Sequence, residues 1–234
     1  MYSLNSKKKF KNGTNKRKVN IKKINDSILI ADTLKLGGEY GLGIQMYDQQ
    51  DSGYNKNGVY KTEVILNNHK VFDMTFNEFS FKDKQYINYL IDYKSFFEKK
   101  IKINKLFIDK IPKISFLDFK LKNGKLSFTK QLKYDITINL IDYKKNTKTI
   151  KFHVIGSNNN LKDVDSLHGQ KIEFDSSKTF QFENKALIFS KNSYHENVKV
   201  KIKNTRDTLI VENKNFPLNK PVKIKFKYLE TDSL

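Results

Sequence analysis

Apolar and polar residues alternate with a period of two through most of this sequence. The stretches KYDITINLIDY, residues 133–143, and TKTIKFHVIG, residues 147–156, both follow this pattern. Because successive side chains of a β-strand point to opposite faces, the pattern predicts strands with one buried face. Turn residues separate these strands, as in KNGK at 122–125. We therefore predict an all-β protein whose short antiparallel strands form two β-sandwich modules of the Ig-like type.

The alternation lapses in two places. In residues 81–109 the apolar residues Ile87, Leu90, Ile91 and Tyr93 have charged residues around them, which favours a short helix or an irregular arm. Small polar residues then run together after Gly156, as is typical of a linker. The predicted organisation is a basic N-terminal segment at 1–17, a β-sandwich at 18–156 with an insertion near 81–115, a linker at 157–168 and a small second β module at 169–234.

The net charge of +20 suggests a nucleic-acid partner, but the kind of basic residue argues against a specific one. Of 45 basic residues only Arg17 and Arg206 are arginine, and base-edge and bidentate phosphate recognition favour the guanidinium group. Lys, Asn, Ile, Phe and Tyr are abundant together, as expected from A/T-rich codons. The lysines also alternate along strands, as in KVKIKN at 199–204. Non-specific attraction to polyanions remains as an alternative function.

Composition also excludes several structural features of the chain. The chain has no cysteine, which excludes disulfides and thiolate metal sites. It has no run of eighteen apolar residues, so no membrane-spanning helix is predicted. The start, MYSLNSKKKFKNG, has basic residues but no apolar core, so it is not a complete secretory signal.

Four glycines lie within seven residues in LGGEYGLGIQMYD, residues 36–48. A nucleotide-binding loop needs a helix N-terminus after its glycines, whereas the residues after Gly43 alternate like a strand. The glycines therefore predict a tight turn and a bulge that need positive φ angles.

The Asp- and Asn-rich stretch that follows does not fit a calcium-binding EF-hand. Counting from Gly58 places Gly53 where the first aspartate should stand and Val64 where the bidentate glutamate should stand. We predict a structural loop closed by side-chain turns. Its residues, with the preceding glycines, are Gly38, Gly41, Gly43, Asp48, Asp51, Asn55, Asn57 and Gly58.

Histidine occurs at 69, 153, 168 and 195. HKVFD, from His69 to Asp73, has a His-x-x-x-Asp zinc spacing, but on a strand these two side chains stand about 13 Å apart. That separation is far beyond zinc bonding distances. Because no His-x-His and no Gly-x-Ser-x-Gly motif is present, we predict no catalytic, cofactor-binding or metal-binding residue in this chain.

Several short motifs resemble a block in cell-wall metallopeptidases of the Bacteroidota, which carry a lysostaphin-type (LytM-like) zinc domain followed by β-rich modules. The matching residues are Gly38, Gly41, Gly43, Ile44, Tyr47, Asp48, Asn55, Asn57, Gly58, Val59, Tyr60, Tyr86, Ile87, Asn88, Ile91, Asp92 and Tyr93, and later Asp142, Asn146 and Thr147. Gln85 stands where the family has arginine, and Lys145 where it has glycine. The resemblance covers roughly residues 18 to 215.

The resemblance implies an accessory role in the cell envelope or periplasm. In this family the peptidase domain precedes the matching block and carries the zinc motifs, so no catalytic residue transfers to this chain. The expected function is non-catalytic: to position a peptidase domain, or to bind peptidoglycan or another envelope protein. An alternative is an active zinc endopeptidase whose LytM-like domain lies on a separately encoded chain.

Overall fold

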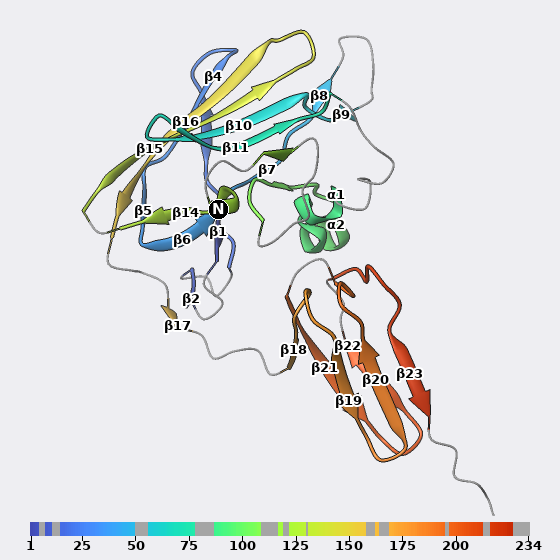
Figure 1. Cartoon of the computed structure of the whole chain (residues 1–234). Helices are drawn as coiled ribbons and strands as arrows, with labels where there is room; N and C mark the ends of the chain where they lie inside the picture. The colour runs from blue at the N-terminus through green and yellow to red at the C-terminus, as the bar shows by residue number, and fades with distance from the viewer. Residues whose placement is uncertain are drawn as a thin grey trace, which may run out of the picture. The chain divides into compact units, whose positions relative to one another are not determined.

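In a computed structural model the chain divides into two compact units, Met1–Ser166 and Leu167–Leu234 (Figure 1). Strands dominate the regular structure of both units, so the all-β prediction is confirmed. The division falls inside the segment 157–168 that the sequence predicts to be a linker. The structure describes residues 1–4, 8–10, 15–49, 56–77, 87–108, 117–118, 122–129, 131–157, 162–163, 169–194, 197–212 and 216–226.

The largest sheet of the first unit has eight strands in the order β13-β11-β10-β15-β16-β4-β3, and β5 also pairs with β16. The strands are β3 (Ile21–Lys23), β4 (Ile28–Ala31), β5 (Leu34–Leu36), β10 (Lys61–Leu66), β11 (His69–Thr75), β13 (Leu117–Asp118), β15 (Lys133–Ile141) and β16 (Thr147–Gly156). In β15 and β16 the apolar residues Ile136, Ile138, Ile150 and Phe152 are buried, and the polar residues between them are more exposed. The sequence alternation therefore marks the buried face of this sheet.

One edge of this sheet differs from the antiparallel arrangement that we predicted. Both β4 and β5 run parallel to β16, with Ile28 opposite Thr149 and Leu34 opposite Val154. β4 and β5 both lie beside β16 and are separated by Asp32 and Thr33, and β3 lies outside β4. Alternation reports which face a residue occupies and carries no information about strand direction, which explains the difference.

A second sheet of three strands completes the first unit. Its order is β1-β6-β14, formed by β1 (Tyr2–Ser3), β6 (Gly38–Gly41) and β14 (Leu126–Phe128). Apolar side chains from both sheets share one core, to which β6 contributes Tyr40 and the larger sheet contributes Phe72 and Val154. Two sheets around a common core make this unit a β-sandwich.

A tyrosine hydroxyl fixes the corner between the two sheets. The chain leaves β14 and enters β15, and the Tyr134 hydroxyl at the start of β15 accepts a hydrogen bond from the Thr129 backbone N–H at 3.0 Å. Ig-like folds also have a tyrosine whose hydroxyl bonds back to the chain a few residues upstream. Gly156 lies beside the same corner, where a Cβ would meet the Thr129 carbonyl oxygen at 1.5 Å.

The N-terminal residues belong to the first unit, whereas we predicted a separate basic segment at 1–17. Met1, Tyr2 and Phe10 are buried, and β1 pairs with β6. In addition, β2 (Lys8–Lys9) pairs with β17 (Lys162–Asp163), within the predicted linker. The high lysine content of this segment conceals its few apolar residues, and these residues place it in the core.

The insertion contains two short helices, α1 (Ile87–Leu90) and α2 (Tyr93–Lys99), as the interrupted alternation predicts. Beyond them β12 (Asn104–Lys105) pairs with β7 (Gly43–Ile44), and a short helix η2 (Lys122–Gly124) precedes β14. Parts of the predicted insertion, residues 81–86 and 109–116, lie outside the described residues. No helix in the described part of the chain is long and apolar enough to cross a membrane.

The second unit has two sheets of three strands and a core of its own. The strands are β18 (Gln170–Ile172), β21 (Val198–Asn204) and β22 (Leu209–Glu212) in one sheet, and β19 (Lys178–Gln181), β20 (Lys185–Phe189) and β23 (Lys223–Phe226) in the other. Ile172, Leu187 and Phe189 lie in the core. The buried ammonium group of Lys185 donates to the carbonyl oxygens of Thr205 and Arg206, at 3.1 and 2.8 Å.

Candidate functional site

Aromatic side chains explain two of the glycines in the glycine-rich stretch. A Cβ at Gly41 would stand 2.2 Å from the Phe107 ring, and one at Gly43 would stand 2.5 Å from the Tyr2 ring. Among Gly38, Gly41 and Gly43 only Gly38 has a positive φ, 104°. The positive φ that we predicted is therefore limited to Gly38, because at Gly41 and Gly43 the demand for glycine comes from rings packed on the strand, which no local sequence signal reveals.

The Asp- and Asn-rich stretch is bounded by a short hairpin. β8 (Asp48–Gln49) pairs antiparallel with β9 (Lys56–Asn57), with Asp48 opposite Asn57. Gly58 follows the hairpin, and a Cβ there would meet nothing within 4 Å. Two of the predicted loop residues, Asp51 and Asn55, lie outside the described residues.

The zinc-like spacing HKVFD lies in the strand β11, as we predicted, but this strand carries a bulge at Val71 that a regular strand would not have. The Asp73 carboxylate accepts a hydrogen bond from the Lys70 ammonium at 2.8 Å. His153 is exposed and bonds Asp135 through Nδ1 at 2.6 Å. His168 and His195 lie outside the described residues. Within the described ranges no three His, Asp or Glu side chains are grouped to hold a metal ion.

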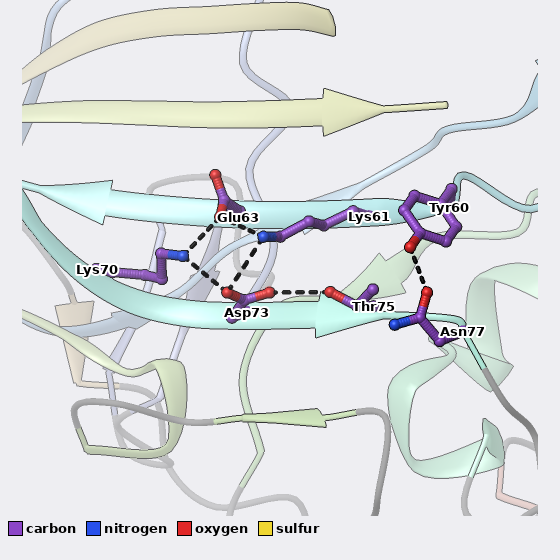
Figure 2. A network of polar contacts seen from close by, with 7 residues as sticks. All are labelled: Tyr60, Lys61, Glu63, Lys70, Asp73, Thr75 and Asn77. Carbon is purple, nitrogen blue, oxygen red and sulfur yellow. Dashed lines mark hydrogen bonds and ion pairs between the residues drawn. The ribbon is translucent and has the colours of Figure 1, made fainter. Parts of the chain in front are cut away.

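Four charged side chains on the β10–β11 hairpin form a network of ion pairs (Figure 2), which we name the hairpin network: Lys61, Glu63, Lys70 and Asp73. Lys70 lies 2.6 Å from Glu63 and 2.8 Å from Asp73, and Lys61 lies 2.9 Å from Glu63. Glu63 and Asp73 stand directly opposite each other in the register. Like charges in that position repel each other, and the two lysines neutralise the pair.

A β-bulge makes this geometry possible. Val64 pairs with Phe72 but Ile65 pairs with Lys70, so β11 carries one extra residue, Val71. In a regular strand Lys70 and Asp73 would face opposite sides of the sheet, because they are three residues apart. The bulge adds one residue between them, so Lys70 and Asp73 lie on the same side of the sheet. The two adjacent residues Val71 and Phe72 both point toward the core. The sequence contains the four charges, but only the bulge brings them to one face.

The network keeps its groups ionised. Burial alone would raise the pKa of Glu63, but hydrogen bonds and charges from Lys70 and Lys61 outweigh it and lower this pKa to about 2. Hydrogen bonds to Asp73 and Glu63 raise the pKa of Lys70 above its ordinary value. General acids and bases have pKa values near the working pH. The pKa of Glu63 is lowered and that of Lys70 is raised, so both lie further from neutral pH than their ordinary values. The network is therefore suited to cross-linking strands and not to proton transfer.

A second cluster surrounds Asp92, and we name it the Asp92 lock: Tyr2, Lys16, Asp92 and Ser95. Asp92 is 6% exposed, caps α2 by accepting from the Ser95 backbone N–H at 3.1 Å, and accepts from the Tyr2 hydroxyl at 2.6 Å. Lys16 forms an ion pair with the same carboxylate. Burial would raise the pKa of Asp92, but the Lys16 and Tyr2 contacts outweigh it and lower the pKa. The lock fastens the N-terminal segment to the insertion.

The remaining candidate is an exposed aromatic corner where β10 begins and β15 ends. Tyr60 and Tyr143 make an edge-to-face contact with ring centroids 5.6 Å apart, and the Lys145 ammonium stands 4.4 Å from the Tyr60 ring centroid. Figure 2 shows Tyr60 bonded through its hydroxyl to Asn77. Sequence reasoning missed this corner because each residue looks like ordinary turn or strand material.

Comparisons with known proteins add no relative. No family model matches the chain, and no curated protein and no solved structure matches it either.

Proposed function

We propose that this chain is a non-catalytic binding protein of the cell envelope, which attaches an associated peptidoglycan hydrolase to the anionic cell wall. The proposal rests first on the residue motifs that resemble the β-rich modules of LytM-like peptidases. The all-β architecture supports it, because β-sandwich modules hold rigid surfaces for binding.

The observation that carries the proposal is that two acidic side chains on the sandwich surface are paired with lysines. Glu63 and Asp73, together with Lys61 and Lys70, form a neutral set that cross-links one hairpin. This set has no net charge, so the excess of 20 basic side chains in the chain lies elsewhere and makes the protein surface cationic on balance. Peptidoglycan carries free carboxylates, and such a surface attracts it electrostatically.

Sedimentation of the full chain with purified sacculi tests this function. We expect binding at about 50 mM salt that weakens about tenfold or more by 200 mM, because surface charge pairs are screened by salt. Sacculi whose carboxylates have been chemically amidated are the matched control and should retain little protein. Equal retention on amidated and native sacculi, or no retention on either, would contradict the proposal.

Two further readouts separate the alternatives. The chain alone, with one equivalent of zinc, should release no soluble muropeptides, and release would overturn the non-catalytic role. Addition of a LytM-like peptidase fragment should give cleavage that the chain enhances on native sacculi. Binding to random-sequence DNA that persists from about 50 to 200 mM salt would instead support nucleic-acid recognition, because purely electrostatic binding is lost over that range.

A further inference from the structure

The exposed aromatic corner of the first unit has a solvent-exposed tyrosine ring close to a lysine ammonium group. Tyr143 is 81% exposed, although tyrosine rings in folded proteins normally bury much of their surface. Its contact with Tyr60 is edge-to-face at 89°, so two ring planes meet at a right angle. The Lys145 ammonium group lies over the face of the Tyr60 ring. We name this set, Tyr60, Tyr143 and Lys145, the tyrosine corner site.

The backbone around this site is fixed by hydrogen bonds. Tyr143 lies in the turn between β15 and β16, where the Asp142 side chain accepts from the Asn146 backbone N–H at 2.8 Å and from its amide at 2.7 Å. The Lys145 backbone N–H donates to the Asp142 carbonyl oxygen at 3.1 Å. The Tyr60 carbonyl oxygen accepts from Phe76 at 2.9 Å. A site that is ordered before binding loses little entropy when a ligand arrives.

The chemistry of the site indicates a sugar that carries an acid. The exposed Tyr143 ring offers packing for the C–H face of a pyranose, and the Lys145 ammonium group offers a partner for a carboxylate. The acids Glu63 and Asp73 add no net charge, because Lys61 and Lys70 neutralise them, and the Asp142 carboxylate in the turn is occupied by two hydrogen bonds from Asn146.

The polar surroundings favour a saccharide over a lipid bilayer. The Asn77 amide oxygen accepts a hydrogen bond from the Tyr60 hydroxyl, and Asn146 lies in the same turn as Tyr143, where its amide donates to Asp142. Sites for polar ligands combine an apolar wall with a few such groups. Stable attachment to a bilayer needs a larger apolar surface than one tyrosine ring supplies.

We propose that the tyrosine corner site binds an acidic saccharide, with Tyr143 packed on the pyranose ring and Lys145 paired with the carboxylate. This inference rests on the proposed wall-binding function and specifies the surface that performs it.

The test uses the full chain and two disaccharide probes in isothermal titration at about 50 mM salt. One probe is N-acetylglucosaminyl-N-acetylmuramic acid, which carries a carboxylate, and the other is neutral di-N-acetylchitobiose. We expect the acidic probe to bind more tightly. Tyr143→Ala should weaken its binding about tenfold, since a single aromatic anchor often carries that much affinity. Lys145→Gln should weaken it about threefold and abolish the preference for the acidic probe.

Two variants serve as controls. Tyr143→Phe keeps the ring and should bind the acidic probe within about twofold of the parent chain, because the packing surface is retained. Phe97→Ala removes another exposed aromatic side chain, on α2 of the same unit, and should leave binding unchanged. Because Tyr143 is exposed, its substitution should not shift the unfolding midpoint, so lost binding reflects the surface.

The outcomes separate this inference from the function on which it rests. If the parent chain binds sacculi and Tyr143→Ala binds them and the disaccharide equally well, the site is overturned and the wall-binding function stands. If the parent chain does not bind sacculi, the function itself fails. If vesicles that contain phosphatidylglycerol bind through Tyr143 while the acidic disaccharide does not, the ligand is a membrane surface and the saccharide proposal is overturned.

Discussion

The Asp92 lock and the hairpin network use the same chemistry at two different depths. In the lock one carboxylate, 6% exposed, accepts from residues that stand as far apart as Tyr2 and Ser95 in the sequence. In the network two carboxylates and two lysines lie within one hairpin and remain partly open to solvent. Both sets have a carboxyl group whose pKa folding lowers.

The comparison shows that the depth of a charged cluster determines how much it contributes to the stability of the fold. Hydrogen bonds to a buried charge are stronger than those at a surface, and their loss leaves a desolvated group without partners. The lock also joins the N-terminal strand, Lys16 and α2, so its loss releases three segments. The network only reinforces a hairpin that backbone hydrogen bonds already hold. We therefore expect the lock to determine the stability of the first unit and the network to adjust it.

The largest effect should come from Asp92→Ala. It removes the acceptor for Tyr2, Lys16 and the cap of α2, and should destabilise the first unit by about 3 kcal/mol. Urea unfolding followed by circular dichroism measures the loss, and hydrogen exchange should rise in peptides from β1 and α2.

A matched control tests whether depth is the cause. Asp26 also pairs with a lysine, Lys23, but both side chains are largely exposed. Asp26→Ala should change the stability by less than about 0.5 kcal/mol. Equal losses for the two aspartates would mean that burial does not distinguish the clusters.

A smaller loss should follow from Gly43→Ala, which disturbs the lock without touching its charges. The new Cβ would stand 2.5 Å from the Tyr2 ring, so the ring must move away from the position that brings its hydroxyl to Asp92. We expect a loss of about 2 kcal/mol. Gly58→Ala is the control, because a Cβ there meets nothing within 4 Å.

The coupling between Gly43 and Tyr2 sharpens this test. If the methyl group acts through the lock, Gly43→Ala combined with Tyr2→Phe should cost less than the sum of the two single substitutions. Full additivity would show that the strain at Gly43 is separate from the lock.

Sequence periodicity predicts much of the fold because it reports which side chains are buried. The all-β class, the strands β15 and β16 and the helical insertion all follow from it. It does not report direction or distant contacts. The parallel pairing of β4 with β16 and the burial of Met1 and Tyr2 depend on residues far away in the chain, so the sequence alone misses them.

Sequence reasoning also predicts the local features of the candidate sites but not the contacts between residues that are distant in the chain. The strand assignment of HKVFD is confirmed, but the bulge at Val71 inside this stretch was not predicted. The Asp92 lock is invisible until Tyr2 and Lys16 reach α2, although Asp-x-x-Ser at 92–95 is a recognisable helix cap. The hairpin network needs a bulge at Val71, and a bulge has no reliable signal in a strand without glycine.

The smallest effect should come from Glu63→Gln, and its pH dependence tests the network directly. Folding lowers the pKa of Glu63 from 4.5 to about 2. A carboxyl group with a lowered pKa stabilises the folded state at pH values above its unfolded pKa and loses this contribution as the pH falls toward its folded pKa. We expect Glu63→Gln to cost about 1 kcal/mol at pH 7.

This cost should shrink between pH 4.5 and about 2, because a protonated glutamate is as uncharged as the glutamine that replaces it. Glu98→Gln on α2 is the control. Glu98 and Lys94 lie 3.9 Å apart on an exposed helix surface, so its stability cost should be close to zero at every pH. A cost for Glu63→Gln that stays constant from pH 7 to pH 3 would mean that the glutamate acts through its shape. The hairpin network would then differ from the Asp92 lock in mechanism as well as in depth.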